Sequence, residues 1–302
     1  MLADPGRYDY LPSVDRPVID WPGGARVAVW VAPNIEHYEY SPPPSPLRTA
    51  TPRPAPDVNW LTLRDYGNRA GVWRMMEVMD RYGVRGSVSL NIAVADHYPE
   101  IIEGCVKRNW ELFSHGIYNT RFMYGMDADQ HREVIADARN TIKRVSGQDL
   151  AGWLSPALSN TEETIDILAE EGLLYTADLM HDDQPLPVKV RKGRFISMPY
   201  SLEINDYTCL VLKRMTPRRY TETIKAQFDQ LYAEGADNPQ VMCLPLHPWL
   251  IGLPHRLREF DEALKYITRH DKVWMATGRE IAQWYYDRHY DKVKAAIDAR
   301  KD

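Results

Sequence analysis

Short apolar runs of strand length alternate with helix-periodic segments along most of this chain, and this alternation constrains its fold most strongly. Residues 26–32 form a β-branched apolar run typical of a buried strand. Val72, Met75 and Met79 then recur at helical spacing, and a second strand-like run follows at 84–90. Strands separated by helices pair in parallel, and about seven such units favour a (β/α) barrel over an open doubly wound sheet.

The remaining elements are predicted from periodicity and capping residues. Asp127 is an expected helix N-cap, and the pairs Asn160 with Glu163 and Thr277 with Glu280 have the capping-box pattern. Strands are predicted at 26–32, 84–90, 110–113, 151–154, 173–176, 196–199, 240–246 and 273–276; helices are predicted at 66–82, 99–108, 128–145, 160–172, 219–235, 257–269 and after residue 277.

We expect one barrel domain over residues 26–302, preceded by an arm formed by residues 1–25. The arm is rich in Pro, Asp and Tyr and shows no periodicity. Its aromatic residues Tyr8, Tyr10 and Trp21 need a surface to cover them, so the sequence favours a homo-oligomer, either a dimer or a tetramer.

Composition and charge exclude several classes of protein. The net charge of −5, with acidic and basic residues interspersed, leaves no basic stripe for nucleic acid or an anionic membrane, so we expect a small-molecule or neutral substrate. The sequence shows neither a secretory leader nor an apolar stretch of about 18 residues, which predicts a cytoplasmic protein. Its three cysteines are widely spaced and are expected to be buried and unpaired.

Polar side chains that can do chemistry follow several of the predicted strands. Asn34 and Glu36 follow the first strand, His115 with Asn119 four positions later follows the third, and His247 follows a late strand. Each alone has a plain interpretation as a core histidine or a solvated loop residue. Because the active site of a parallel α/β fold lies at the carboxyl ends of its strands, we expect these five residues to converge.

Four further residues are weaker candidates for substrate binding. Trp153 lies near the end of the strand predicted at 151–154 and Ser155 follows that strand; Trp153 is expected to shape a pocket with the proline-rich loop 41–56. Asp183 and Glu203 follow later strand ends. For these two carboxylates, a role in a turn is an equally good interpretation.

Seven segments in order resemble the polysaccharide deacetylase superfamily, and within it the allantoinase-like branch of purine degradation. The resemblance covers nearly the whole chain, and its most specific segment is Tyr66-Gly67-Asn68-Arg69-Ala70-Gly71-Val72-Trp73-Arg74. The other matching segments are 21–36, 114–116, 152–153, 182–183, 199–206 and 246–248. The resemblance implies a distorted (β/α) barrel that hydrolyses the C–N bond of an amide, ureide or imide.

Mapped onto metal-dependent members, the resemblance also implies roles for the residues at the strand ends. It places Asn34 at the general base, Glu36 at the metal carboxylate, His115 and Asn119 at the two metal histidines, and His247 at the histidine that serves the leaving group. Two of these positions depart from the family pattern, because Asn34 has no useful basicity and Asn119 replaces an imidazole.

The same departures bear on the metal. Catalytic zinc usually has three strong ligands and one open position, and Glu36 and His115 supply only two. A weak divalent site, for zinc or another metal, formed by Glu36, His115 and Asn119 stays open at this stage. The allantoinase-like branch is itself implied to work without the usual zinc triad.

The leading hypothesis is therefore a hydrolase of a small amide, cyclic ureide or cyclic imide. Glu36 or His115 would activate water, and His247 would protonate the departing nitrogen. Asn34, Asn119, backbone N–H groups or a loosely held metal would stabilise the oxyanion. The alternatives are a polysaccharide or peptidoglycan N-deacetylase, and an inactive homologue that only binds a ligand.

Overall fold

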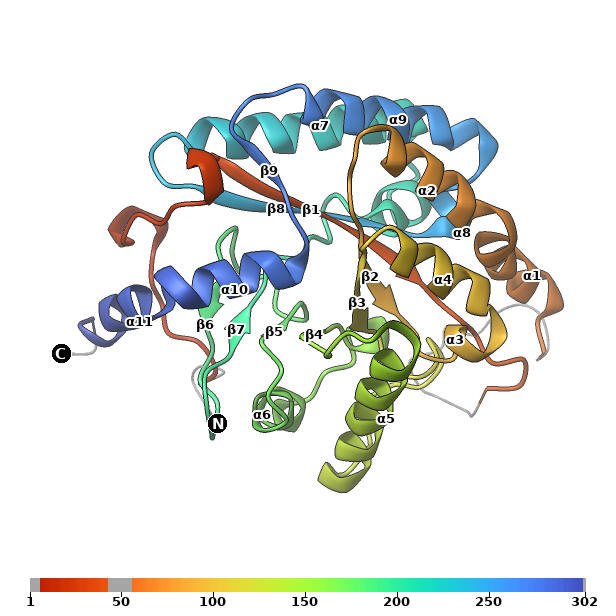
Figure 1. The fold of residues 1–302 in the computed structure, drawn as a ribbon, viewed down its shortest axis with the longest axis horizontal. Helices are drawn as coiled ribbons and strands as arrows, with labels where there is room; N and C mark the ends of the chain where they lie inside the picture. Colours follow the sequence, from red (N-terminus) through yellow and green to blue (C-terminus); the bar gives the residue numbers. More distant parts are fainter. Residues whose placement is uncertain (1–5, 43–55, 301–302) are drawn as a thin grey trace.

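A single curled sheet with helices around it forms the computed structural model, which describes residues 6–42 and 56–300 (Figure 1). The strand order is β6-β7-β5-β4-β3-β2-β1-β8, and β9 also pairs with β1. All pairings are parallel except that of β6 with β7. The predicted α/β fold with a barrel-like parallel sheet is confirmed, although it has nine strands instead of about seven and several of them are shorter than predicted.

Most elements match the predicted order but differ in length. The strands are β1 (Val27–Ile35), β2 (Ser87–Leu90), β3 (Glu111–Ser114), β4 (Gly152–Trp153), β5 (Tyr175–Thr176), β6 (Leu186–Pro187), β7 (Ile196–Ser197), β8 (Gln240–Leu246) and β9 (Val273–Met275). The helices are α1 (Val58–Tyr66), α2 (Val72–Arg81), α3 (Val94–His97), α4 (Pro99–Lys107), α5 (Ala128–Ser146), α6 (Glu162–Glu170), α7 (Pro217–Glu234), α8 (Pro248–Ile251), α9 (Pro254–Thr268), α10 (Gly278–Arg288) and α11 (Tyr290–Asp298).

Strand β1 is the axis of the sheet. It pairs with β8 along almost its whole length, from Val27 opposite Gln240 to Pro33 opposite Leu246. Its other edge is shared, because β9 pairs with its beginning and β2 with its end. The strand continues through Pro33 to Ile35, so the predicted end at residue 32 is wrong. A proline only removes one donor from the ladder, and here it does not end the strand.

A π-helical turn joins α1 to α2 without interrupting the helical run. This turn, Gly67–Gly71, packs against the chain that follows β8, where Trp249 and Pro248 approach it closely. A Cβ atom at Gly71 would lie 2.0 Å from the carbonyl oxygen of Pro248, so only glycine permits this approach. Because α1 and α2 form one helical run, the helix begins at Val58 and not at the predicted residue 66.

Two of the three predicted capping patterns are confirmed. Asp127 caps α5, and Thr277 with Glu280 forms a capping box at the start of α10. The third prediction is displaced by one residue, because Thr161 is the N-cap of α6 and its partner is Thr164. The side chains of Asn160 and Thr161 can both accept a hydrogen bond from the first N–H groups of a helix, so the sequence pattern alone does not identify the N-cap.

The described part of the arm, residues 6–25, packs against the barrel domain of the same chain. Trp21 is 2% exposed, and its indole N–H donates to the carbonyl oxygen of Gln240 at 3.0 Å. Arg16 binds Asp182 at 2.5 Å. Trp21 therefore needs no partner subunit, which corrects that part of the oligomer argument. Tyr10 is 78% exposed, and the homo-oligomer, the cytoplasmic location and the boundary between arm and domain stay predictions.

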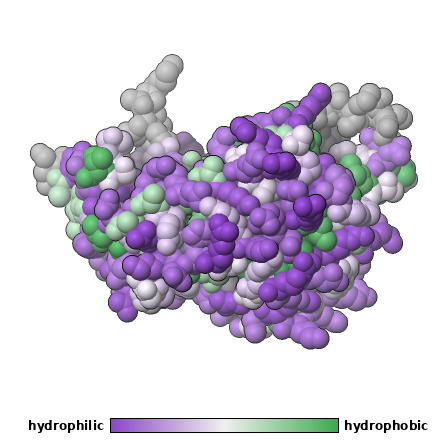
Figure 2. Space-filling model, turned by 90° about the horizontal axis from the view of Figure 1, so that it is seen from above, coloured by the Kyte–Doolittle hydropathy of each residue, from purple (hydrophilic) through white to green (hydrophobic). Residues whose placement is uncertain are grey.

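The outer surface is mostly hydrophilic on the face shown in Figure 2, with hydrophobic residues in small scattered groups. Among the described helices, none combines the length and the apolar character that crossing a bilayer requires. The three cysteines are buried and unpaired, as predicted. Most of the proline-rich loop lies outside the described residues, so its predicted role as a pocket wall is untested.

Candidate active site

The candidate active site lies where the strands end. Alternate residues of β1, namely Ala28, Trp30 and Ala32, belong to one buried cluster with aromatic residues of β3 and β5. The two-residue period of a strand continues this row to Asn34, which is buried, and then to Glu36 just beyond the strand. The local sequence of β1 thus delivers both side chains to the same side of the sheet.

Three residues predicted to be catalytic meet at this point. His115 directly follows β3, His247 directly follows β8, and both are buried together with Glu36. Glu36 Oε1 lies 3.7 Å from His115 Nε2 and also 3.7 Å from His247 Nε2. These separations are longer than a hydrogen bond, so the contacts are electrostatic. The Nε2 atom of each histidine can therefore bind another partner.

His247 is held by the buried carboxylate of Asp206. One Asp206 oxygen accepts the backbone N–H of His247 at 2.8 Å, and the other lies 2.6 Å from its Nδ1. Burial disfavours the charged ring, but the carboxylates of Asp206 and Glu36 outweigh burial and raise the pKa of His247 above its ordinary value. His247 thus carries its proton more readily than a free histidine.

His115 is oriented by the backbone. Its Nδ1 lies 2.8 Å from the carbonyl oxygen of Leu154, an acceptor, so Nδ1 carries a hydrogen and Nε2 is the ring nitrogen that faces Glu36. Near this histidine, Asp178 accepts two hydrogen bonds from Ser155, from its backbone N–H at 2.7 Å and from its hydroxyl at 2.8 Å. Burial raises the pKa of Asp178 to about 6.

Glu36 stays ionised despite its burial. Burial alone would raise its pKa, but His247, His115 and the hydroxyl of Tyr38 together lower the pKa of Glu36 to about 2. Tyr38 donates to Glu36 Oε2 at 2.5 Å and accepts the amide N–H of Asn119 at 2.7 Å. Glu36, Tyr38 and Asn119 therefore form one hydrogen-bonded chain.

Asn34 serves the local structure of the site. Its amide nitrogen lies 3.2 Å from the hydroxyl of Tyr200 and also faces the carbonyl oxygens of Ala32 and Leu246, at 3.3 and 3.4 Å. This arrangement ties the ends of β1 and β8 together. The amide group supplies no base at the position where the resemblance implies one.

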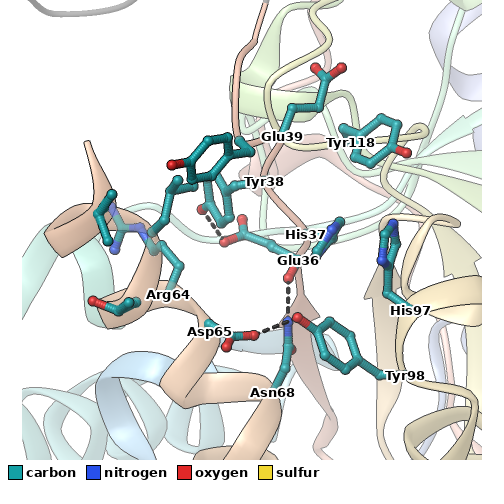
Figure 3. A pocket seen from close by; sticks show the side chains of 14 residues that line it. Glu36, His37, Tyr38, Glu39, Arg64, Asp65, Asn68, His97, Tyr98 and Tyr118 are labelled. Atoms are coloured by element: carbon teal, nitrogen blue, oxygen red, sulfur yellow. Dashed lines mark hydrogen bonds between the residues drawn. The ribbon is translucent and has the colours of Figure 1, made fainter. Parts of the chain in front are cut away.

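A cavity of about 470 Å³ opens beside Glu36 (Figure 3). The rings of His37 and His97 stack at its wall with centroids 4.0 Å apart, and burial followed by the charge of His97 lowers the pKa of His37 to about 4. The lining residues are Glu36, His37, Tyr38, Glu39, Tyr40, Val58, Leu61, Thr62, Arg64, Asp65, Asn68, His97, Tyr98 and Tyr118.

The structure does not bring the weaker candidates to this cavity. Trp153 is fully buried in the core and donates to the hydroxyl of Ser155 at 3.1 Å, so both residues support the region behind His115. Asp183 and Glu203 line a different cavity of about 430 Å³, and Glu203 binds Lys213 at 2.5 Å. Their role in substrate binding stays a prediction.

The donor set at the site does not fit catalytic zinc. Within residues 6–42 and 56–300, no three His, Cys, Asp or Glu side chains are arranged to hold a metal ion. Glu36 and His115 are two strong donors, and the amide oxygen of Asn119 is buried without a hydrogen-bond partner among the described residues. A neutral amide oxygen is a weak substitute for the imidazole or thiolate that zinc favours as a third ligand.

Sequence reasoning missed several groups at the site. Asp206 lies within the matching segment 199–206, and nothing in the sequence pairs it with His247, which lies 41 positions further along. Tyr38 follows Glu36 by two residues, and this spacing could have placed both on one side of the strand end. The sequence also gives no sign that Arg64 stacks on Trp249, where the guanidinium carbon lies 3.3 Å from the ring centroid.

Comparison with known proteins gives the site a family context. The model of the polysaccharide deacetylase family matches residues 53–176. A Pseudomonas aeruginosa protein classed by name as a polysaccharide deacetylase is 29% identical, with a TM-score of 0.81 over 90% of this chain and 95% of that one. The chain is therefore similar to proteins named as polysaccharide deacetylases.

Other relatives of the chain carry two kinds of name. A Schizosaccharomyces pombe protein assigned by name to the polysaccharide deacetylases is 25% identical over 299 residues, which cover 89% of this chain and 93% of the relative. The crystal structure of PuuE allantoinase is 27% identical, with a TM-score of 0.78 over 90% of this chain and 94% of that one. The fold is thus shared by proteins named as deacetylases and by one named as an allantoinase.

Proposed function

We propose that this chain hydrolyses the C–N bond of a small amide, cyclic ureide or cyclic imide. The observation that carries the proposal is the convergence of Glu36, His115 and His247 at the strand ends, where Glu36 lines a cavity of about 470 Å³. The relatives support it, because deacetylases hydrolyse an amide C–N bond and one structural relative is named as an allantoinase.

In this proposal His115 is the base and His247 is the acid. The lone pair of His115 Nε2 accepts a proton from the attacking water, while His247, protonated because of Asp206, donates a proton to the departing nitrogen. Each proton transfer contributes a factor on the order of 10²–10⁴ in rate. Of the two candidates for the base, Glu36 is the weaker, because a group with a pKa of about 2 accepts protons poorly at neutral pH.

Glu36 then acts through its charge. Its carboxylate stabilises the protonated ring of His247 and lies equally far from His115, so it keeps both histidines directed at one point. We assign the Tyr38 hydroxyl and the Asn119 amide to the developing oxyanion, because both are donors beside this carboxylate. Substrate binding would redirect the Tyr38 hydroxyl from Glu36 to the substrate.

A second candidate function is N-deacetylation of a polysaccharide or peptidoglycan. It is favoured by the family match over residues 53–176 and by the names of the relatives. The site fits it less well, because the position of the second metal histidine holds Asn119. An inactive ligand-binding homologue is the third reading, and the shared approach of Glu36, His115 and His247 disfavours it.

The test is a hydrolysis screen on the purified protein. Allantoin, hydantoin, succinimide and chitooligosaccharides are incubated with enzyme before and after chelation, with metal content measured in both samples. The proposal expects ring opening of at least one of the three cyclic compounds, little affected by chelation. Acetate release from chitooligosaccharides without ring opening would establish the second candidate instead, and ligand binding without any product would establish the third.

A further inference from the structure

Arg64 is held in an unusual position at the wall of the cavity beside Glu36. Its guanidinium carbon lies 3.3 Å from the centroid of the Trp249 ring and 4.6 Å from that of Trp60. It also lies 5.5 Å from the ring centroid of Tyr38, whose hydroxyl binds Glu36 (Figure 3). Three aromatic rings therefore fix this cation next to the proposed reaction centre.

Two nitrogen atoms of the Arg64 guanidinium group lack acceptors. Its Nε and Nη1 atoms are buried without a hydrogen-bond partner among the described residues, and so is the indole Nε1 of Trp249. The internal segment 43–55 contains neither Asp nor Glu that could pair with Arg64. Leaving buried donors unpaired costs roughly 1–3 kcal/mol each, so such donors normally have a use.

The acidic residues of the cavity already have partners of their own. Glu39 binds Arg121 at 2.7 Å, and Asp65 is bound by Arg69 and by the hydroxyl of Tyr98. Glu36 is balanced by the two histidines and Tyr38. Arg64 is the single Lys or Arg among the described residues that line the cavity. Its Nε and Nη1 atoms have no carboxylate partner among the described residues.

A stacked guanidinium offers its edge to a ligand. The flat face of Arg64 is covered by Trp249, so the N–H groups can only be satisfied by an acceptor lying in the plane of the group. A carboxylate matches that edge with two parallel hydrogen bonds, whereas a neutral carbonyl oxygen matches one. The geometry therefore favours a planar anion over a neutral acceptor.

We propose that Arg64 binds a carboxylate carried by the substrate, so that the enzyme acts on amides or cyclic ureides with an acidic group beside the scissile C–N bond. This inference rests on the proposed hydrolase function and names its substrate class. Glu36 with the two histidines defines the reacting end of the substrate. Arg64, anchored by Trp249 and Trp60, defines the other end and selects for charge.

The test compares hydantoin-5-acetic acid with its neutral carboxamide. Binding is measured by calorimetry on Glu36→Gln, so that turnover does not interfere, and the same measurement is made with Arg64→Met or Arg64→Lys added. The control is Arg144→Met, an exposed arginine on α5. The acid should bind this background about 10- to 100-fold more tightly than the carboxamide, and Arg64→Met should abolish this preference.

Arg64→Lys keeps the charge without the planar edge, and it should retain only part of the preference. Equal binding of acid and carboxamide before Arg64 is changed would overturn the proposal, and so would an undiminished preference in a folded Arg64→Met protein. The result is separate from the proposed function. Arg64-dependent binding of the acid with no hydrolysis by the unmodified enzyme would support the carboxylate site and refute the hydrolase.

Discussion

At the scale of single residues, the chemistry depends on how two histidines are held. His247 has a carboxylate on Nδ1 and another facing Nε2, whereas His115 has a backbone carbonyl on Nδ1 and the Glu36 carboxylate facing Nε2. The two identical side chains are thereby directed to different tasks. An acid and a base can be made from one residue type when their environments differ.

The first prediction concerns the Asp206 carboxylate. The acid form of His247 is present below its pKa, which lies above the ordinary value, and is lost as pH rises through that pKa. Asp206→Asn removes the larger attractive charge and lowers the pKa of His247. The alkaline limb of the pH–rate profile should therefore move to lower pH, and turnover at neutral pH should fall by on the order of 10²-fold.

Asp183→Asn is the matched control for that profile, because Asp183 lines the other cavity. This control should leave the alkaline limb in place. An Asp206→Asn enzyme that is folded and keeps the alkaline limb of the unmodified protein would show that His247 is not the acid.

At the scale of elements, the π turn between α1 and α2 links two strand ends. Asn68 within the turn donates to the backbone oxygen of Glu36 at 2.8 Å, while Gly67 and Gly71 pack against the segment after His247. The spacing of Val72 and Met75 predicts the helix here but not the π turn. A π turn holds one residue more than an α-helical turn, and the apolar pattern does not indicate this additional residue. The most specific segment of the resemblance is thus the one that joins the halves of the site.

The second prediction follows from this close packing. Gly71→Ala places a Cβ atom against the carbonyl oxygen of Pro248, so the segment carrying His247 must shift. Unfolding in urea should show a loss of stability of about 1–3 kcal/mol or more, with a matching fall in turnover. In Gly104→Ala the new Cβ meets only the side chains of Trp73 and Met76, and its effect should be smaller. Equal stability of the two variants would contradict the proposed constraint.

The order of the strands predicts part of the candidate site but not all of it. The convergence of Glu36, His115 and His247 was predictable, because parallel strands end on one side of a sheet. The orientation of Trp153 was not, because β4 has only two residues and no alternation to read. The contact of Asp206 with His247 depends on the path of the chain after β7, which local patterns do not determine.

At the scale of the whole molecule, the chain shares its fold with a protein named as a polysaccharide deacetylase, but among its described residues no three His, Cys, Asp or Glu side chains are arranged to hold a metal ion. Glu36 and His115 stand where two ligands are implied, and the amide of Asn119 is bound to Tyr38. Glu36 accepts a hydrogen bond from Tyr38 and faces His115 and His247. This arrangement predicts a hydrolase that does not depend on tightly bound zinc.

The third prediction concerns the third zinc ligand, whose implied position is occupied by Asn119. Asn119→His adds a third strong donor beside Glu36 and His115, and the purified variant should hold zinc close to one ion per chain. The unmodified protein and the exposed control Asn140→His should lose zinc on dialysis against a chelator. Stoichiometric zinc retained by the unmodified protein after that dialysis would show that our reading of Asn119 is wrong.

The most direct test of the central claim is the rate of ring opening of allantoin, hydantoin and succinimide by the unmodified enzyme and by Glu36→Gln, measured side by side. Glu36 is the group that faces both histidines, so neutralising it removes the charge that organises the site. The account predicts ring opening by the unmodified enzyme and a rate at least about 10²-fold lower for Glu36→Gln. Equal rates for the two proteins, or no ring opening of any of the three compounds, would contradict it.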